Sequence, residues 1–320
     1  MKALVTGGLG FIGSALVSRL QHEGWEVLVV DTMEDSVIRM QSRADSSIVE
    51  ILPGDISRLA NTRIPKIDVV FHFAAHYANE RSLAEPLKSI ETNVLGTIAV
   101  LNFCRYNAVP RLVYASSSGV YGGMDVVAYS EDAKPGPQTP YEVGKYSAEV
   151  LCEGFCNIYD ISYVAPRFFN VYGKGDIPGQ WRSVIPLFFR SALSGMTLNV
   201  TGKTCSRDFT YIDDVIDGVM AGLQRIEEAP GRISLIYNIA TGVEVFIKTA
   251  ADLIVKLTGS PSEVEVKEPR NWDNALRRVG DTHKFRALFP DVANSMIQLA
   301  DGLNKSLSWY MDVCKIRRSL

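Results

Sequence analysis

A short apolar strand that runs directly into a glycine-rich turn is the feature that most restricts the fold of this chain. The strand is predicted at residues 2–6, and a helical pattern follows Gly13 and continues to about Glu23. The glycines satisfy G-x-G-x-x-G from Gly8 and G-x-x-G-x-x-G from Gly7. This spacing permits a tight turn, close approach of the backbone to a pyrophosphate and close helix–strand packing, with the helix N-terminus facing the phosphates. The pattern predicts a βαβ unit that binds a dinucleotide.

The second predicted strand, residues 26–30, ends in an acidic residue, Asp31. An acid at this place accepts hydrogen bonds from the adenosine ribose hydroxyls and repels a 2′-phosphate. No arginine follows immediately, because residues 32–35 are Thr-Met-Glu-Asp. These observations favour NAD over NADP.

Strands and helices continue to alternate along the first half of the chain. Further strands are predicted at residues 48–52, 68–73, 111–115 and 161–166, and one long helix from about Leu83 to Arg105. The alternation predicts an α/β fold with a doubly wound parallel (Rossmann) sheet. Later elements are shorter and more mixed. We therefore expect an NAD-binding domain at 1–165, completed by parts of 208–243, and a smaller C-terminal α/β substrate domain at 166–320.

The stretch from Thr139 to Lys145 is typical of the first turns of a helix. Thr139 is a good N-cap, Pro140 suits the first helical position, and Glu142 completes a capping box. Tyr141 and Lys145 stand at i and i+4 and share one face. The helix dipole and the ammonium both favour phenolate, and lower a phenol pKa of ~10 towards neutral pH. We therefore expect Tyr141 to serve as a general base; the alternative is a surface tyrosine beside a surface lysine.

Other candidate site residues follow the predicted strands, because ligands bind beyond the carboxyl ends of strands in an open parallel sheet. Asp55 is placed to meet the adenine edge, and the small residues Ala74 and Ala75 let a cofactor lie close. The run Ser116–Ser118 is placed to hydrogen-bond a substrate, or is an ordinary Ser/Gly loop. We expect His72 to be a packed strand histidine.

Composition limits the classes of function. The 320 residues are 47% hydrophobic and 22% charged with a net charge of −3, which is ordinary for a soluble globular enzyme. The lack of long charged runs speaks against a nucleic-acid or membrane surface, and no apolar run reaches the ~18–20 residues of a membrane span. The N-terminus lacks a signal pattern, so a cytoplasmic protein is expected. Five cysteines without Cys-x-x-Cys spacing predict buried thiols, and the four histidines give no support for a metal site.

The motifs in this order resemble those of the extended short-chain dehydrogenase/reductase family, in its NAD-dependent nucleotide-sugar epimerase/dehydratase branch, and UDP-glucose 4-epimerase-like proteins are the nearest kin. The resemblance covers essentially the whole chain. It is carried by Thr6–Gly13, Asp31, Gly54–Ile56, His72–Ala75, Asn93–Thr97, Ser116–Gly122, Tyr141-x-x-x-Lys145, Arg167–Gly173, Arg207–Phe209, Tyr237–Gly242 and Arg270-x-x-Asp273.

The resemblance implies roles for individual residues. Tyr141 matches the general acid/base, Lys145 the lysine that holds the nicotinamide ribose and lowers the tyrosine pKa, and Ser117 the hydroxyl that bonds the reacting sugar oxygen. The implied NAD-binding residues are Gly7, Gly10, Phe11, Ile12, Gly13, Asp31, Asp55, Ile56, Phe73, Ala74, Ala75, Asn93 and Lys145. The implied substrate-binding residues are Ser117, Tyr141, Asn170, Arg207, Arg270 and Asp273. Among the latter, Asn170 and the two arginines would bind the diphosphate, and Asp273 the uridine ribose.

The implied reaction is 4-epimerisation of a nucleotide sugar, with a UDP-hexose or a derivative as substrate. Tyr141 takes the proton of the sugar 4-hydroxyl while C4 gives hydride to NAD⁺, and the 4-keto sugar turns over and takes the hydride back on its other face. The 4,6-dehydratases carry Thr-Asp-Glu where this chain has Ser117-Ser118-Gly119, and the uronate decarboxylases carry Glu where Ser118 stands. No further acid is apparent nearby in the sequence. These departures disfavour a dehydratase and a decarboxylase, which stay alternatives together with a 4-reductase of the same family. A non-catalytic dinucleotide-binding protein is a more remote alternative.

Two further expectations come from the resemblance. The family's substrate-size gate falls near Arg277 and Arg278, where a bulky residue would disfavour N-acetylhexosamines and a cation would favour a uronate. Family members pair through two long helices, here about 83–105 and 140–158, so a homodimer is expected. The chain departs from the family pattern at Gly144, where serine is usual before the lysine.

Overall fold

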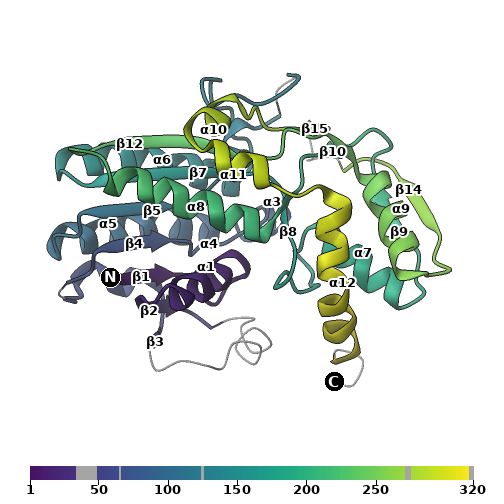
Figure 1. The fold of residues 1–320 in the computed structure, drawn as a ribbon, viewed down its shortest axis with the longest axis horizontal. Coiled ribbons are helices and arrows are strands. Elements are labelled where there is room, and N and C mark those ends of the chain that lie inside the picture. Colours follow the sequence, from purple (N-terminus) through teal and green to yellow (C-terminus); the bar gives the residue numbers. More distant parts are fainter. Residues whose placement is uncertain (34–48, 65, 124–125, 271–274, 317–320) are drawn as a thin grey trace. The chain divides into compact units, whose positions relative to one another are not determined.

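The computed structural model describes residues 1–33, 49–64, 66–123, 126–270 and 275–316 of the chain (Figure 1). The chain divides into two compact units. Unit 1 comprises Met1–Val120, Pro137–Arg167 and Ile216–Tyr237, and unit 2 comprises Tyr121–Gly136, Phe168–Val215 and Asn238–Leu320. Each unit therefore collects segments that are distant in the sequence. Their assignment to the cofactor and the substrate stays a prediction.

A parallel sheet forms the centre of unit 1, with strand order β3-β2-β1-β4-β5-β7-β12 and the short β6 beside β7. The pairs from β3 across to β7 are all parallel. The strands are β1 (Lys2–Thr6), β2 (Glu26–Asp31), β3 (Val49–Pro53), β4 (Val69–His72), β5 (Arg111–Tyr114), β6 (Ser116–Ser117), β7 (Ser162–Phe168) and β12 (Ser234–Ile239). Because β2 and β4 flank β1, the carboxyl end of β1 is the switch point at which such sheets bind ligands. The predicted doubly wound sheet is confirmed.

Helices cover both faces of this sheet, α1 (Phe11–His22) and α8 (Ile212–Glu227) on one and α5 (Gly96–Tyr106) and α6 (Pro140–Ile158) on the other (Figure 1). Apolar residues of the strands pack with those of α5 and α6 in one buried cluster. Strands buried on both faces need such near-continuous apolar runs, which is the pattern that predicted them. Two 3₁₀ turns, η1 (Ile56–Asn61) and η3 (Ser118–Tyr121), follow β3 and β6.

Helix α6 begins as the sequence predicts. The side chain of Thr139 accepts a hydrogen bond from the backbone amide of Glu142, and the carboxylate of Glu142 accepts in return from the backbone amide of Thr139. Pro140 occupies the first turn. This capping box fixes where the helix starts, because it satisfies amides that have no partner inside the helix.

The single helix predicted from Leu83 to Arg105 is wrong. The segment forms α3 (Asn79–Ala84), α4 (Pro86–Ile90), a π-helical turn η2 (Glu91–Leu95) and then α5. Pro86 has no amide hydrogen and disfavours a helical residue before it, so Glu85 leaves the helix (φ −129°) and a new helix starts at the proline.

Unit 2 contains three longer helices and several two- or three-stranded ladders. The ring of Phe189 on α7 stacks on Tyr310 of α12 with centroids 4.2 Å apart, and both helices pack on α9. Its elements are β8 (Val171–Tyr172), α7 (Val184–Leu193), β9 (Leu198–Thr201), β10 (Ser206–Arg207), β11 (Thr210–Tyr211), β13 (Val245–Phe246), α9 (Ile247–Thr258), β14 (Val264–Lys267), β15 (Arg277–Arg278), α10 (His283–Leu288), α11 (Pro290–Ser295) and α12 (Leu299–Ile316).

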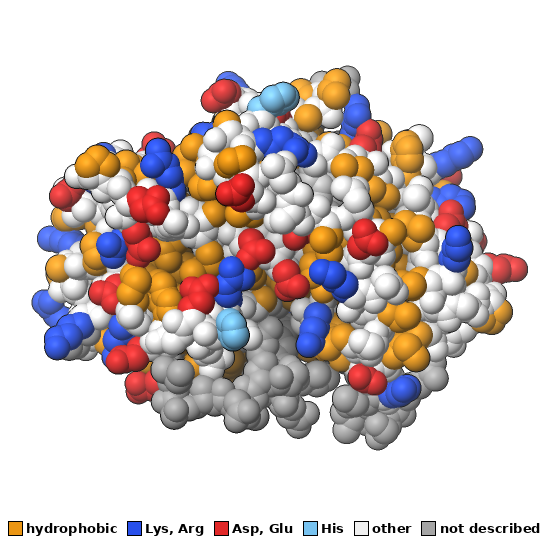
Figure 2. All heavy atoms as spheres, in the orientation of Figure 1, with side chains coloured by type: hydrophobic (Ala, Val, Ile, Leu, Met, Phe, Trp, Pro, Cys, Tyr) orange, Lys and Arg blue, Asp and Glu red, His pale blue; other side chains and the backbone are white. Residues whose placement is uncertain are grey.

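Acidic and basic side chains are interspersed on the face of the molecule that Figure 2 shows. Within the described part of the chain, no helix has the length and apolar character needed to cross a bilayer. The described residues also contain no group of three or more histidine, cysteine or carboxylate side chains that could hold a metal ion. All five cysteines are described; they are buried and form no disulfide bond.

Candidate functional site

The glycine-rich turn after β1 packs against the backbone that follows β4. Gly7 has a φ of +68°, and a Cβ atom added there would lie 2.6 Å from the backbone nitrogen of Ala74. A Cβ at Gly13 would overlap the carbonyl oxygen of Gly7. Both positions therefore require glycine, because any side chain would separate the turn from its neighbours. Gly10 is the N-cap of α1 and no side chain caps this helix, so its first amides are available to an anion.

The carboxylate of Asp31 lies beside this turn. One oxygen accepts from the backbone nitrogen of Leu9 at 2.9 Å, and the other accepts from Met33 at 2.9 Å. A carboxylate oxygen has two lone pairs, so each retains capacity for a ribose hydroxyl. Asp55 caps η1 through Ser57, and Ile56 is buried.

His72 is a packed strand histidine, as the sequence predicts. Its Nε2 bonds Thr97, whose hydroxyl donates to the carbonyl of Asn93, and its Nδ1 bonds Thr6, whose hydroxyl accepts from Ala74. These neighbours assign the ring as neutral with the proton on Nε2. Burial lowers the pKa of His72 to about 3, and the charge of Lys145 adds to this shift.

Asn93 holds the loop that follows β4. Its side-chain oxygen accepts from the backbone nitrogen of His76 at 2.9 Å, and its nitrogen donates to the carbonyl of His76 at 3.1 Å. A Cβ added to Gly144 of α6 would lie 3.0 Å from Cβ of Asn93. The glycine that departs from the family pattern thus lets α6 approach η2 closely. Contact of Asn93 with NAD stays a prediction.

Ser117, Tyr141 and Glu142 surround Gly119. A Cβ added to Gly119 would lie 3.3 Å from Oγ of Ser117, 3.7 Å from the Tyr141 ring and 3.1 Å from Cγ of Glu142. The Ser117 hydroxyl and the Tyr141 ring are therefore neighbours, although 24 positions separate them in the sequence. Oγ of Ser117 accepts from the backbone nitrogen of Gly119 at 3.0 Å, which directs its hydrogen elsewhere.

Glu142 is the residue that sequence reasoning missed at this place. No acid was apparent near the serines in the sequence, yet the side chain of Glu142 lies where a residue at 119 would project. Its capping-box spacing predicted its bonds to the helix start, and nothing in that local pattern indicated the proximity to Gly119.

Lys145 is buried one turn further along α6. Its ammonium donates to the carbonyl of Ala115 at 2.9 Å and lies 5.0 Å from the ring centroid of Tyr114. Burial lowers the pKa of Lys145 to about 8, and the charge of Glu149 opposes this shift. Glu149 in turn forms a buried, two-bond ion pair with Arg167, at 3.0 and 2.9 Å.

The residues expected to bind the substrate diphosphate lie in unit 2. Arg207 donates to the carbonyls of Ala275 and Leu276, and Asn170 donates to the carbonyl of Asp208, the residue that follows Arg207. Arg270 is exposed. Asp273 lies outside the described residues.

Arg277 and Arg278, at the expected size gate, have different surroundings. Arg277 is exposed and pairs with Glu244. Arg278 is buried and donates to the carbonyl of Gly122 at 3.1 Å. Arg278 thus ties β15 to the turn at Gly122 within unit 2.

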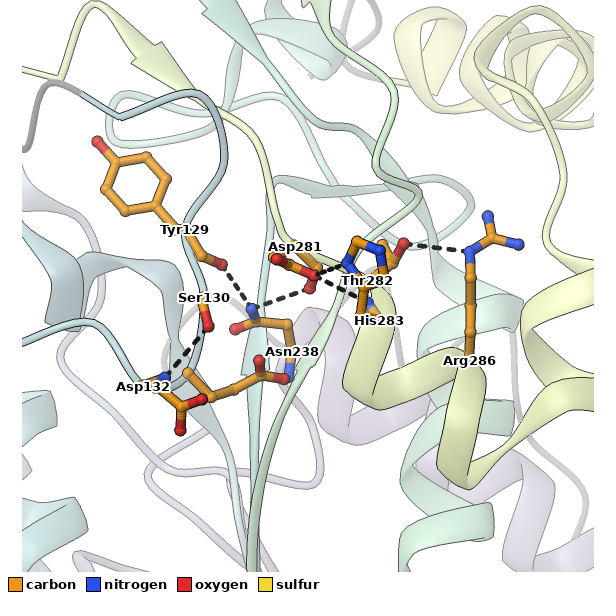
Figure 3. Close-up of polar contacts among 9 residues, drawn as sticks. Tyr129, Ser130, Asp132, Asn238, Asp281, Thr282, His283 and Arg286 are labelled. Atoms are coloured by element: carbon orange, nitrogen blue, oxygen red, sulfur yellow. Dashed lines mark hydrogen bonds and ion pairs between the residues drawn. The ribbon is translucent and has the colours of Figure 1, made fainter.

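Asn238 organises a polar cluster in unit 2 (Figure 3). Its side-chain nitrogen donates to the carbonyls of Tyr129 and Asp281, and its oxygen accepts from the hydroxyl of Tyr121. The backbone of Asn238 donates to Glu131 at 2.7 Å. The cluster joins the segment 121–136 to Asn238 and to the turn before α10, which all belong to unit 2.

Comparison with known proteins gives one consistent result. Residues 3–240 match the model described as the NAD dependent epimerase/dehydratase family. The chain is 33% identical over 321 residues to a UDP-glucose 4-epimerase of Mycolicibacterium smegmatis, with 97% of this chain and 98% of the relative covered. It is 29% identical over 325 residues to a UDP-N-acetyl-alpha-D-glucosaminuronate decarboxylase of Bacillus cytotoxicus, with 98% of each covered.

Solved structures agree over nearly the whole chain. An epimerase of Methanothermobacter thermautotrophicus superposes with a TM-score of 0.90 at 33% identity, covering 99% of this chain and 94% of that one. The UDP-glucuronic acid 4-epimerase of Bacillus cereus, in complex with UDP-glucuronic acid and NAD, gives a TM-score of 0.86 at 28% identity, covering 98% and 100%.

Proposed function

Because the chain belongs to the NAD dependent epimerase/dehydratase family, we propose that it is a 4-epimerase of a nucleotide sugar, with a UDP-hexose or a derivative as substrate and a transient 4-keto intermediate. The observation that carries this proposal is the grouping of Ser117 and Tyr141 around the side-chain-free Gly119, with Lys145 on the same helix face. The solved relative that holds UDP-glucuronic acid supports UDP as the nucleotide.

NAD is the cofactor of this family, and unit 1 fits it. The turn at Gly7 leaves no room for a side chain, α1 begins without a side-chain cap, and Asp31 is held beside the turn. The residues that would hold NAD are Gly7, Gly10, Phe11, Ile12, Gly13, Asp31, Asp55, Ile56, Phe73, Ala74, Ala75, Asn93 and Lys145. These residues would hold NAD where it could supply reversible hydride exchange with the sugar C4.

The chain's own residues hold and move the proton. Tyr141 takes the proton of the sugar 4-hydroxyl as the carbonyl forms and gives it back to the other epimer. The ammonium of Lys145 favours the phenolate form of Tyr141. Ser117 donates its hydrogen to the reacting oxygen, because its own oxygen already accepts from Gly119. In unit 2, Asn170, Arg207, Arg270 and Asp273 would bind the nucleotide diphosphate and ribose.

Dehydration and decarboxylation fit the site less well. The family members that eliminate water or CO₂ use an acid beside the catalytic hydroxyl, where this chain has Ser118 and Gly119. Among the described residues, the carboxylate of Glu142 lies near that place, and it accepts hydrogen bonds from Asn79 and from the backbone of Gln138 and Thr139. It is therefore committed to the start of α6. A 4-reductase would consume NADH and is distinguished by its need for added cofactor.

We also propose that the protein is a homodimer. Helix α6 exposes Val150 and Ile158, and the neighbouring α4 and η2 expose Leu87 and Leu95. An exposed apolar surface shared by packed helices is typical of an interface.

The variant Tyr141→Phe tests the proposed base. It keeps the ring and removes the hydroxyl, so we expect kcat to fall by about 10²–10⁴-fold, the usual contribution of general acid–base catalysis, while the bound NAD content is unchanged. Tyr146→Phe, on the same helix, is the matched control and should retain the wild-type rate. Full activity of Tyr141→Phe on every candidate sugar would overturn the assignment.

A further inference from the structure

We propose that Asn79 is a positioning residue whose side-chain amide fixes the first turn of α6, and with it the phenol of Tyr141, against the loop that follows β4. The inference rests on the proposed function, because Tyr141 is the base in that reaction. Asn79 lies at the start of α3, outside the family motifs in the sequence, and no comparison assigns it a role.

Asn79 uses both ends of its amide on the start of α6. Its nitrogen donates to Oε1 of Glu142 at 3.1 Å, and its oxygen accepts from the hydroxyl of Thr139 at 2.9 Å. These two partners are the two members of the capping box on either side of Tyr141. A side-chain amide can donate to a carboxylate through its nitrogen and accept from a hydroxyl through its oxygen at the same time.

The environment makes this contact sensitive to charge. Glu142 is 1% exposed, and its other oxygen, Oε2, accepts from the backbone nitrogens of Gln138 and Thr139 at 3.0 and 3.2 Å. A second carboxylate in place of the Asn79 amide would face the buried Glu142 carboxylate, and like charges at this distance repel strongly away from water.

The loop that Asn79 terminates is restrained at a second point. The side chain of Asn93 bonds both the nitrogen and the carbonyl of His76, and Asn93 itself packs against Gly144 of α6. Between these two restraints, Ala78 has a φ of +76°, which is costly for a residue with a Cβ. Such a conformation persists only where its surroundings impose it, and the bonds of Asn79 and Asn93 are part of those surroundings. The loop carrying the predicted NAD contacts Phe73–Ala75 and the helix carrying Tyr141 are thereby one hydrogen-bonded assembly.

A charge-swap cycle tests the inference. Asn79→Asp keeps the acceptor for Thr139 but loses the donor to Glu142 and sets two carboxylates against each other. We expect kcat to fall on the order of tenfold or more near pH 8, with KM for the nucleotide sugar nearly unchanged, because the base is displaced and the substrate contacts are not.

The double variant Asn79→Asp/Glu142→Gln should restore kcat to near the wild-type value. The oxygen of the amide introduced at position 142 can accept from the two backbone nitrogens while its nitrogen donates to the carboxylate introduced at position 79, so every bond is kept with one direction reversed. Glu142→Gln alone should be the mild variant, because the Asn79 amide can turn over and accept from it. Asn61→Asp, which changes the same amide to a carboxylate in η1, is the matched control and should leave kcat unchanged.

Amide hydrogen exchange gives a readout that needs no substrate. The backbone amides of Thr139 and of residues 141–143 should exchange faster in Asn79→Asp and return to wild-type protection in the double variant. If the wild type acted on no sugar, the proposed function would fail and the exchange measurement would still decide the role of Asn79. Wild-type kcat and exchange in Asn79→Asp, or a double variant no better than the single one, would overturn the inference.

Discussion

Lys145 holds its charge in a buried place, between the carbonyl of Ala115 and the ring of Tyr114. Burial lowers its pKa to about 8, and nearby Glu149 limits the shift. Below that pH the ammonium is charged, and in the proposed mechanism it would favour the phenolate of Tyr141. As the pH rises through about 8 the ammonium loses its proton, so the proposed activity should decline on the alkaline side.

Glu149→Gln tests this coupling. Loss of the carboxylate disfavours the ammonium and lowers the pKa of Lys145, so the alkaline decline of kcat should move to lower pH. The change also leaves Arg167 without its buried partner, which should lower the free energy of unfolding by about 3–5 kcal/mol in urea denaturation. Asp217→Asn, which breaks an exposed ion pair with Arg19, is the control and should move neither quantity appreciably. An alkaline limb that stays in place in Glu149→Gln would contradict the role given to Lys145.

A residue's contacts could be predicted where the pattern that indicates them lies within a few positions of the sequence. The capping box of Thr139 and Glu142 lies within four positions, so the sequence alone predicted it. The approach of Glu142 to Gly119 depends on how two distant segments pack, and no local pattern reports it. The site roles carried over by resemblance stay predictions until variants are measured.

At the scale of elements, the exposed face of α6 and α4 makes a direct prediction about assembly. Val150 is 52% exposed and Leu87 is 78% exposed, so charge at either position should not disturb the fold. In the proposed dimer, a charged side chain at either position would lie unpaired in the interface. Val150→Glu and Leu87→Glu should therefore shift the protein from dimer to monomer by analytical ultracentrifugation at micromolar concentration.

The control for this measurement is Met196→Glu, a 48% exposed apolar residue of unit 2, which should stay dimeric. A wild-type protein that sediments as a monomer at these concentrations would contradict the dimer. The predicted pairing helix at 83–105 is in fact broken at Pro86 and contains the π-helical turn η2. Its apolar periodicity was a correct signal for burial, and the proline was the signal for the break.

At the scale of the whole molecule, the sequence predicted the class of fold better than it predicted which segments belong to each of the two units. The parallel sheet was predictable because each strand is a short apolar run with a helix after it. The membership of 121–136 in unit 2 was not, because it depends on bonds such as those from Tyr129 to Val279 and from Asn238 to Tyr129. Hydrogen bonds between residues more than a hundred positions apart produce no periodic pattern in the sequence.

The most direct test of the central claim is proton NMR of the purified protein, without added NAD, mixed separately with UDP-glucose, UDP-N-acetylglucosamine and UDP-glucuronate. We expect the C4 epimer to appear with one of them, because a 4-epimerase regenerates its bound NAD in every turnover. Conversion of UDP-glucuronate in preference to neutral sugars would support a role for the Arg277–Arg278 region in selecting an acidic sugar. No epimer from any of the three, with NAD confirmed bound, or turnover that requires stoichiometric NADH, would contradict the proposed UDP-sugar 4-epimerase.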